Sequence, residues 1–545
     1  MPEKLLTNRE GSDASSTACI YTAISFAPVQ GFIEKSRKLR DLYGASQILS
    51  YLSWKIVCAA NSKNCEVISP AIAEDDCTNV ASVDIVQGMP NRILIKGDFS
   101  CNDAQKALMV GWKEIIEACR KWLGDNLGID DSNSSWANSW TRWKIHAWEV
   151  FWGGGDSIES AMRDLETRKL RRGWTVPNWN GESSSLSGHD AIAYPNMDRQ
   201  ITPDNKRNEG LEKKEIDNFY VKLANALENS KNEDEPKFLD PSEKLSIPEL
   251  IKRLVTHHQV VKDLPKFPRT KRFSELLRKE DDDEKAKRGY WTGWFMGDGD
   301  KVGDHLKSLT EAQDVSNFSQ ALRTWGKQFQ DGFHRERLGR VVYAGGDDFL
   351  GVMYGIRNGT EEEKQRKGTE AIDWLIAMHQ DWQSSNLEIN LSVGFVWAGH
   401  SVPQRDVLQH CREAEKLAKS LGRDRVTIRV LFNNGQFVQW TTPWEYLKWL
   451  KDYRDRNDNT GKDANWSHVY TDLAQLKARH AIPPATAETA NDAIALNLFG
   501  LYFGEDNREI LSQQRGQITG SEDPKSMIEW IDGMIKVGWQ LCSNS

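Results

Sequence analysis

The sequence has no long apolar run and no signal-like N-terminus. None of its apolar segments approaches the roughly 20 residues that a helix needs to cross a lipid bilayer. Residues 1–18 are polar, lack the apolar core of a secretory signal, and are expected to be a disordered lead-in. The composition, 39% hydrophobic and 28% charged, is typical of a soluble globular protein. We therefore expect a cytoplasmic protein that does not contact membranes.

Cysteine is scarce and scattered. The chain has 8 cysteines among 545 residues and no CxxC pair. Its closest group, Cys58, Cys65 and Cys77, matches neither a zinc-site spacing nor a disulfide spacing well. We expect most cysteines to be buried thiols in a reducing compartment.

An excess of basic residues is also missing. The 71 basic and 79 acidic residues give a net charge of −8, whereas a protein that grips nucleic acid by itself is more often basic. Any contact with RNA is therefore expected to be local or shared with basic partner subunits. The basic cluster Lys35, Arg37, Lys38 and Arg40 is expected to face solvent or another domain rather than RNA.

The length allows about three to four domains. Residues 19–105 combine short apolar strands with a long helical stretch and predict a compact α/β unit. Residues 106–285 are expected to be a helical intervening domain that becomes polar and ends in the acidic run 280–285. Residues 286–435 read β-α-β-β-α-β, which predicts a split βαβ sheet with helices on one face. Residues 436–545 are predicted to be mainly helical.

Two adjacent aspartates, Asp347 and Asp348, occupy a glycine-containing turn between two apolar strands. Gly345 and Gly346 permit positive φ and leave the backbone bare, so that a phosphate can approach closely. Neighbouring carboxylates repel each other unless they share a proton or a cation. Taken alone, however, the motif is equally compatible with an acidic hairpin turn that has no function.

A third aspartate makes a metal site more attractive. Asp298 lies at the end of the strand that should run beside this hairpin, and it can therefore approach Asp347 and Asp348. Such an oxygen cluster suits two Mg²⁺ or Mn²⁺ ions, to which Gly299 could add a carbonyl ligand. We expect Asp347 to be the shared ligand and Asp348 to be a second ligand or a base. Calcium is a weaker alternative, because the full EF-hand pattern is absent.

Lys419 and Arg423 fall one helical turn apart near the end of a predicted helix, which Gly422 can terminate. Two interpretations of this pair stay open. It is either ordinary helix-end charge that complements the macrodipole or a binding site for a triphosphate tail.

The motifs GDGD, GGDDF and AKSLGRD, in this order, resemble the nucleotidyl-cyclase palm shared with GGDEF diguanylate cyclases. Residues 25–54 and 89–94 narrow the resemblance to the large polymerase/cyclase subunit of type III CRISPR RNA-guided complexes, closest to the Cmr (III-B) branch. Residues 167–174 and 185–192 also have counterparts there, and the similarity runs over residues 19–432.

The resemblance implies an α+β multidomain fold with two ferredoxin-like nucleotidyl-cyclase palms and helical intervening and C-terminal domains. The first palm is expected to be degenerate, because residues 27–29 are Ala-Pro-Val where residues 298–300 of the second, active palm are Asp-Gly-Asp. The implied activity is conversion of ATP to cyclic oligoadenylate second messengers by two-metal catalysis. It would occur when target RNA binds a complex that contains guide RNA and other effector subunits.

The resemblance also implies the roles of the candidate site residues. The catalytic and metal-binding carboxylates are Asp298, Asp347 and Asp348. The nucleotide-binding residues are Gly345, Gly346, Lys419 and, as a weaker assignment, Arg423.

Two features of many relatives are expected to be missing. Only about 18 residues precede the first palm, too few for an HD nuclease domain, so no DNase activity of that type is expected. Relatives often bind zinc through CxxC pairs in the intervening domain, but serines stand at these positions within residues 181–192. We therefore expect no zinc.

Three alternatives stay open. The same palm could adenylate a different small-molecule acceptor, because pocket shape decides the acceptor. A stand-alone diguanylate cyclase differs by one letter in the motif, but the first palm and intervening domain argue against it. A non-catalytic scaffold subunit is the third, and the intact carboxylates argue against that.

Overall fold

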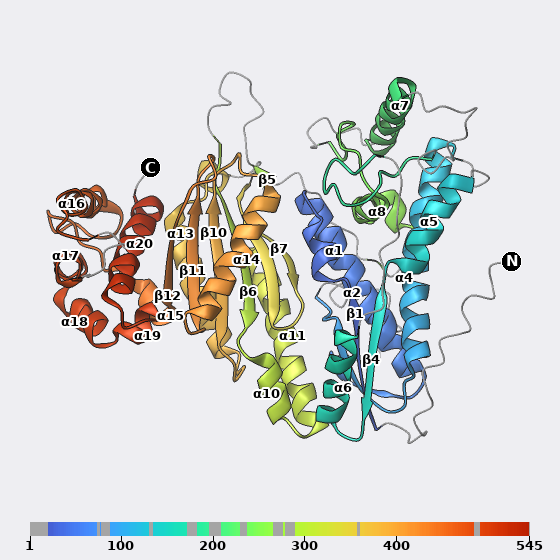
Figure 1. Cartoon of the computed structure of the whole chain (residues 1–545), viewed down its shortest axis with the longest axis horizontal. Helices are drawn as coiled ribbons and strands as arrows, with labels where there is room; N and C mark the ends of the chain where they lie inside the picture. The colour runs from blue at the N-terminus through green and yellow to red at the C-terminus, as the bar shows by residue number, and fades with distance from the viewer. Residues whose placement is uncertain are drawn as a thin grey trace.

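The computed structural model describes twelve stretches of the chain, which are residues 20–72, 77, 88–129, 134–171, 182–195, 209–228, 237–264, 267, 276–277, 289–356, 360–483 and 491–543. The expected lead-in and the acidic run 280–285 lie outside them. Figure 1 shows the N-terminal half of the chain at one end of the molecule, a second sheet in the middle, and C-terminal helices at the other end.

The first α/β unit contains a four-stranded antiparallel sheet in the order β2-β3-β1-β4. Its strands are β1 (Tyr21–Ala27), β2 (Glu66–Ser69), β3 (Arg92–Lys96) and β4 (Glu149–Gly155). The long helix α2 (Leu39–Ser62) packs on this sheet through a largely buried set of side chains. Numbered by chain position, the strand order is 2-3-1-4, which is that of a ferredoxin-like sheet.

Strand β4 corrects the sequence analysis, which predicted a helical domain over residues 106–285. It pairs with β1 along its whole length, so this sheet includes a strand from beyond residue 105. Its glycines explain why the pattern was missed. A Cβ on Gly153 would lie 2.3 Å from the backbone nitrogen of Leu165, so glycine is needed for helix α6 (Ile158–Leu170) to pack tightly on the strand.

The remaining helices of this half surround the first sheet and share one apolar core with it. They are α1 (Gln30–Glu34), α4 (Cys101–Leu127), α5 (Ser134–His146), α7 (Glu209–Leu227), α8 (Ile247–Leu254) and α9 (His258–Val261). The ends of α4 follow from the sequence. The Ser100 hydroxyl accepts a hydrogen bond from the Asp103 N–H at the start, and Gly128, at φ 65°, ends the helix.

The basic cluster near residue 35 faces non-helical segments of the intervening region, in agreement with one of the two expectations. Lys35 Nζ lies 3.1 Å from Asp190, and Lys38 Nζ lies 2.9 Å from Glu243. Serines in residues 182–195 also hold this segment by hydrogen bonds. The Ser184 hydroxyl donates to Glu249 Oε2 at a distance of 2.5 Å.

The second sheet has six strands in the order β12-β11-β10-β6-β8-β7. They are β6 (Thr292–Gly299), β7 (Gly339–Ala344), β8 (Asp348–Met353), β10 (Leu391–Ala398), β11 (Arg425–Leu431) and β12 (Phe437–Pro443). Strands β10 and β11 are parallel, and the other neighbours are antiparallel. The first four of these strands by chain position, β6, β7, β8 and β10, again follow the ferredoxin-like order. A separate two-stranded ribbon joins β5 (Leu276–Leu277) to β9 (Gly355–Ile356).

Helices cover both faces of the second sheet, whereas the sequence analysis placed them on one face. Helices α11 (Ala312–Arg335) and α13 (Gly368–Ser384) pack on one side, and α14 (Gln404–Ser420) packs on the other. The two short helices on this unit are α10 (Val302–Ser308) and α12 (Glu361–Lys364). The central strands are buried throughout and therefore lack the apolar-polar alternation of a one-sided sheet.

The chain after β12 is helical and packs on that strand, which itself lies within residues 436–545, the region expected to be mainly helical. Its helices are α15 (Trp444–Leu447), the 3₁₀ turns Lys448–Lys451 and Gly461–Asp463, α16 (Ser467–Ala478), α17 (Ala493–Phe503), α18 (Glu505–Gln513), α19 (Arg515–Thr519) and α20 (Pro524–Cys542). Gly533 allows α20 to approach, because a Cβ there would lie 2.5 Å from the Gln439 carbonyl oxygen. Within the described stretches, no helix is both long and apolar enough to span a membrane.

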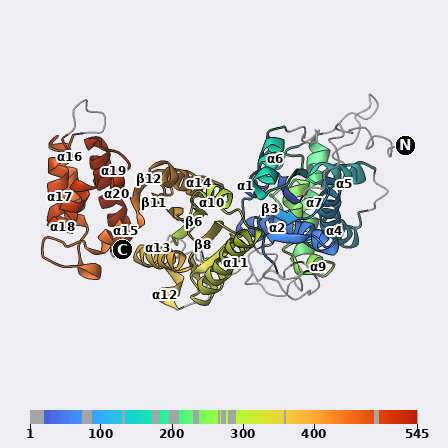
Figure 2. The ribbon, with the colours of Figure 1, turned by 90° about the horizontal axis from the view of Figure 1, so that it is seen from below.

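Helix α11 packs on the second sheet and also contacts the first α/β unit, next to which it lies in Figure 2. The Ser319 hydroxyl accepts a hydrogen bond from the Ala71 N–H at 3.0 Å. Arg323 donates to the Ala71 carbonyl oxygen at 2.5 Å. The segment that leaves β2 is thus anchored to the second unit.

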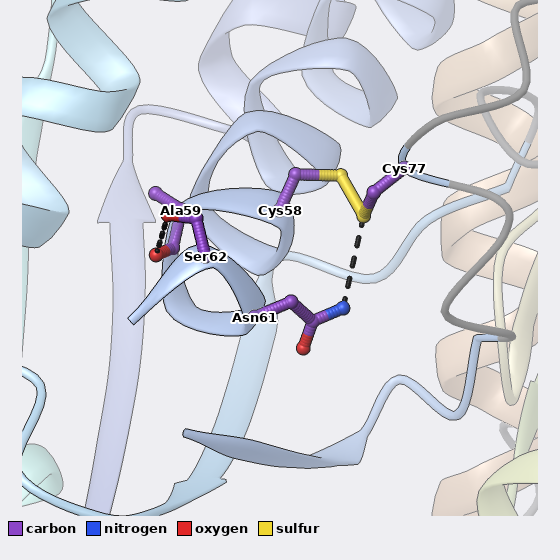
Figure 3. The surroundings of a disulfide bond; sticks show 5 residues. All are labelled: Cys58, Ala59, Asn61, Ser62 and Cys77. Carbon is purple, nitrogen blue, oxygen red and sulfur yellow. Dashed lines mark hydrogen bonds between the residues drawn. A yellow bond between two sulfur atoms is a disulfide. The ribbon is translucent and has the colours of Figure 1, made fainter. Parts of the chain in front are cut away.

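One cysteine expectation was wrong. Cys58 of α2 and Cys77 form a disulfide, with their Cα atoms 5.5 Å apart (Figure 3). The separation of 19 positions in the sequence hides this pairing, because only tertiary structure brings the two sulfurs together. Cys119 and Cys411 are buried free thiols, as expected.

Candidate active site

The structure brings Asp298 beside the acidic hairpin. Strand β6 pairs antiparallel with β8, and Asp298 lies opposite Asp348 in the register. The Gly299 N–H donates a hydrogen bond to the Asp347 carbonyl oxygen at 2.9 Å. Backbone pairing therefore fixes the end of β6 against the turn, and the three carboxylates occupy one edge of the sheet.

These carboxylates perturb one another. Desolvation by the surrounding chain raises the pKa of Asp347 to about 6, and the negative charge of Asp298 adds to this rise. Asp348 is exposed to solvent. Desolvation by the neighbouring chain and the negative charges of Asp298 and Asp347 nevertheless raise its pKa to about 8. The Tyr343 hydroxyl donates to Asp348 Oδ1 at 3.2 Å and partly offsets that rise. The site thus carries more negative charge than its own groups stabilise.

Lys419 lies among the same carboxylates. Its ammonium group makes a hydrogen-bonded ion pair with Asp298 and lies 2.5 Å from Glu415 Oε1. Burial alone would lower the pKa of Lys419, but the hydrogen bonds to Asp298 and Glu415 raise it above its usual value. Sequence reasoning missed Glu415, although a carboxylate four residues before a lysine on one helix is a recognisable signal.

Arg423, the second predicted cation, lies elsewhere. Its guanidinium Nε is 3.9 Å from Asp300 Oδ1, and its side chain is 46% exposed. Lys419 and Arg423 therefore contact different aspartates of the GDGD motif. The contact of each residue with its own aspartate explains its position, and no interaction between Lys419 and Arg423 is needed.

The two glycines of the hairpin differ in their surroundings. Gly346 adopts φ 145°, and a Cβ there would meet no atom within 4 Å, so one side of the turn is open. A Cβ on Gly345 would lie 3.2 Å from the backbone of Gly88 in the first unit. Open space for a ligand thus lies at Gly346, while Gly345 forms part of the contact between the units.

The carboxylates have the chemistry that a hard divalent cation prefers, but they do not converge into a complete metal site. Among the residues that the structure describes, no group of three or more histidine, cysteine, aspartate or glutamate side chains converges closely enough to hold a metal ion. The carboxylate oxygens of Asp298, Asp347 and Asp348 are the type that Mg²⁺ and Mn²⁺ prefer. The raised pKa values of Asp347 and Asp348 show the charge that a cation would balance. Lys419 supplies positive charge to Asp298 instead.

A ferredoxin-like sheet with carboxylates at the end of its first strand and at its hairpin defines a palm domain. Residues 291–427 match the second palm domain of Cas10/Cmr2, and residues 21–117 match the N-terminal domain of the CRISPR-associated protein Cmr2. These two regions of the chain therefore match domains of the Cas10/Cmr2 family, which confirms the resemblance in its sequence.

Solved structures were compared with the fold of this chain. A chain of the type III-B Cmr-beta apo structure is 11% identical, with a TM-score of 0.57 over 95% of this chain and 81% of that one. Csm1 of T. onnurineus is 15% identical, with a TM-score of 0.45 over 96% and 70%. A Csm1–Csm4 cassette in complex with one ATP is 14% identical, with a TM-score of 0.42 over 96% and 70%. Of these three, the first shows a shared fold. A search of curated sequences found no match.

Proposed function

We propose that this chain is the nucleotidyltransferase subunit of a type III CRISPR effector complex and converts ATP to cyclic oligoadenylates. One observation carries the proposal. In a domain of the Cas10/Cmr2 second-palm family, Asp298 lies opposite Asp348 across β6 and β8, with the Lys419 ammonium on Asp298. This is an arrangement of hard-oxygen ligands and a cation suited to a metal-bound polyphosphate.

Asp298, Asp347, Asp348 and the Gly299 carbonyl would hold two Mg²⁺ or Mn²⁺ ions. When bound, such ions activate an attacking hydroxyl and stabilise the leaving pyrophosphate. Lys419 remains tethered by Glu415 when it leaves Asp298, so its ammonium group can turn to a phosphate without losing its anchor. The open side of Gly346 leaves room for that phosphate.

The proposal assigns the chemistry to the second palm and a supporting role to the first. Strand β1 ends in Ala27, followed by Pro28, so the first palm lacks a carboxylate at the position that Asp298 holds in the second. Its contribution is instead the backbone of Gly88, which packs against Gly345. We include in the proposal other effector subunits, guide RNA and target RNA as partners, and the cytoplasm as location.

The test is product analysis with the reconstituted complex. Guide-loaded complex, matching target RNA, ATP and Mg²⁺ should yield cyclic oligoadenylates by mass spectrometry, and Asp347→Ala with Asp348→Ala should abolish them. Product from GTP alone would favour a diguanylate cyclase. Unchanged ATP consumption in the double variant would favour a scaffold. An adenylated small molecule, formed after addition of cell extract, would favour a different acceptor.

A further inference from the structure

The second aspartate of the GDGD motif has no role in the proposed metal site. Asp300 directly follows β6, and its side chain is 4% exposed. The Ser392 hydroxyl lies 2.8 and 2.9 Å from its two carboxylate oxygens, and the Asp424 N–H donates to Oδ2 at 2.9 Å. Its own N–H donates to the Asn390 carbonyl oxygen at 2.8 Å. Asp300 thus joins β6, β10 and the start of β11 while facing away from solvent.

The segment that Asp300 holds has an uncommon backbone. Gly422, Arg423 and Asp424 adopt φ values of 129°, 66° and 50°, so three consecutive residues lie in the left-handed region. Side chains with a Cβ rarely adopt this conformation, and it persists only where the surroundings hold it. Here the Asp300 carboxylate accepts the Asp424 N–H, which the turn would otherwise leave without a partner.

The same turn is braced from the C-terminal helices. A Cβ on Gly520 would lie 3.0 Å from Leu421, and the buried Arg425 guanidinium donates to the carbonyl oxygens of Gln517 and Ile518. The segment 421–425 is therefore held from two sides, and Asp300 and His379 contact it from within the second unit. The Arg423 side chain is 46% exposed, and its Nε lies 3.9 Å from Asp300 Oδ1.

We infer that Asp300 is a positioning residue, which holds the strained turn 422–424 so that Arg423 is presented to the phosphates of bound ATP. The turn directly follows α14, the helix that carries Lys419 to its ion pair with Asp298. This inference rests on the proposed function for the identity of the ligand. The conformational role of Asp300 does not depend on it.

Four variants of the full chain separate this role from others. Asp300→Ala removes the acceptor, and Asp300→Asn keeps one oxygen for the Asp424 N–H. Asp424→Gly in the Asp300→Ala background relieves the cost of the left-handed conformation and keeps the N–H. Asp424→Ala in the same background removes the same carboxylate but keeps a Cβ, so it is the matched control.

Two readouts are compared, which are hydrogen exchange of the amides of residues 422–424 and the KM and kcat for ATP in the target-bound complex. Loss of a hydrogen bond to a charged group predicts that Asp300→Ala raises both the exchange rate and KM by about tenfold or more. We expect a much smaller change in kcat. Asp300→Asn should stay near wild type, and Asp424→Gly but not Asp424→Ala should recover part of the loss.

Unchanged exchange in Asp300→Ala would overturn the inference. So would Asp300→Asn failing as badly as Asp300→Ala, because the negative charge, and not the hydrogen bond, would then be required. Equal recovery by the two Asp424 variants would also overturn it, since the backbone conformation would then be irrelevant. If the wild-type complex makes no product from ATP, the proposed function fails, but the exchange measurement still decides whether Asp300 holds the turn.

Discussion

Lys419 and Asp298 form an ion pair across 121 positions of sequence, at the edge of the sheet where the acidic hairpin turns. The three carboxylates of the candidate site belong to Asp298, Asp347 and Asp348. Within the described part of the chain, this pair is the only observed ion pair between a cationic side chain and one of these carboxylates. Because Glu415 holds the other side of the ammonium group, Lys419 is tethered independently of Asp298. The residue can therefore exchange one partner for another without leaving the site.

Replacing Lys419 should weaken ATP binding more than it slows turnover. Lys419→Met removes a charge-assisted hydrogen bond to the phosphates, and we expect KM for ATP to rise by about tenfold or more. Steady-state kinetics of the target-bound complex measures this. Lys416→Met is the matched control, because Lys416 is exposed on the same helix. Equal effects of the two substitutions would contradict a phosphate role for Lys419.

Metal binding should depend on Asp298. We expect Asp298→Asn to weaken Mn²⁺ binding by about tenfold or more, since affinity for hard cations falls with ligand charge. Isothermal titration of the purified chain with Mn²⁺ measures this without reference to activity. Asp304→Asn serves as the control, because Asp304 is exposed on α10 and pairs with Lys307. Chelation by EDTA should stop product formation and leave the unfolding temperature nearly unchanged. Wild-type affinity in Asp298→Asn would remove Asp298 from the metal site.

The disulfide should stabilise the first unit. A crosslink between residues 19 positions apart restricts the unfolded chain by about 3 kcal/mol in the loop-entropy model, so Cys58→Ser should lower the midpoint of thermal unfolding under non-reducing conditions. Cys65→Ser is the control, because Cys65 is a free cysteine close to α2. A reductant should lower the wild-type midpoint to that of Cys58→Ser and leave Cys58→Ser itself unchanged. Peptide mapping that finds Cys58 and Cys77 both alkylated in unreduced protein would show that the bond does not form.

Much of the architecture could be predicted from local pattern. The short strands of the first unit, such as β2 and β3, were predicted within residues 19–105, because short apolar runs flanked by polar residues leave little ambiguity. The approach of Asp298 to the hairpin also followed, because strand order decides which strand ends meet. Strand β4 could not be predicted, since its three glycines gain their meaning only from the close packing of α6.

Other features depend on contacts that sequence does not display. Lys419 was expected at a triphosphate, but its contacts with Asp298 and Glu415 depend on how α14 lies across the sheet. The buried bonds of Asp300 depend on β10, which lies some ninety residues further along the chain. Tertiary packing also decides that helices cover both faces of the second sheet. It likewise decides the Cys58–Cys77 pairing, which local spacing does not reveal.

Contact between the two α/β units should be sensitive to a single methyl group. Gly88 adopts φ 103°, and a Cβ there would lie 2.5 Å from the Ala344 carbonyl oxygen, directly before the GGDD turn. Gly88→Ala therefore combines backbone strain with a clash, and we expect it to cost about 2–4 kcal/mol and to reduce ATP turnover. Denaturant unfolding and product formation together measure both effects.

Gly128→Ala separates the two causes. Gly128 also has positive φ, at 65°, but a Cβ there would meet no atom within 4 Å, so only the backbone cost of about 1 kcal/mol applies. Because Gly128 ends α4, far in sequence from the hairpin, its substitution should leave turnover per folded molecule unchanged. If Gly88→Ala behaves like Gly128→Ala in both measurements, the first unit does not control the position of the GGDD turn. A selective loss of turnover in Gly88→Ala would instead show that the first unit holds the hairpin in place.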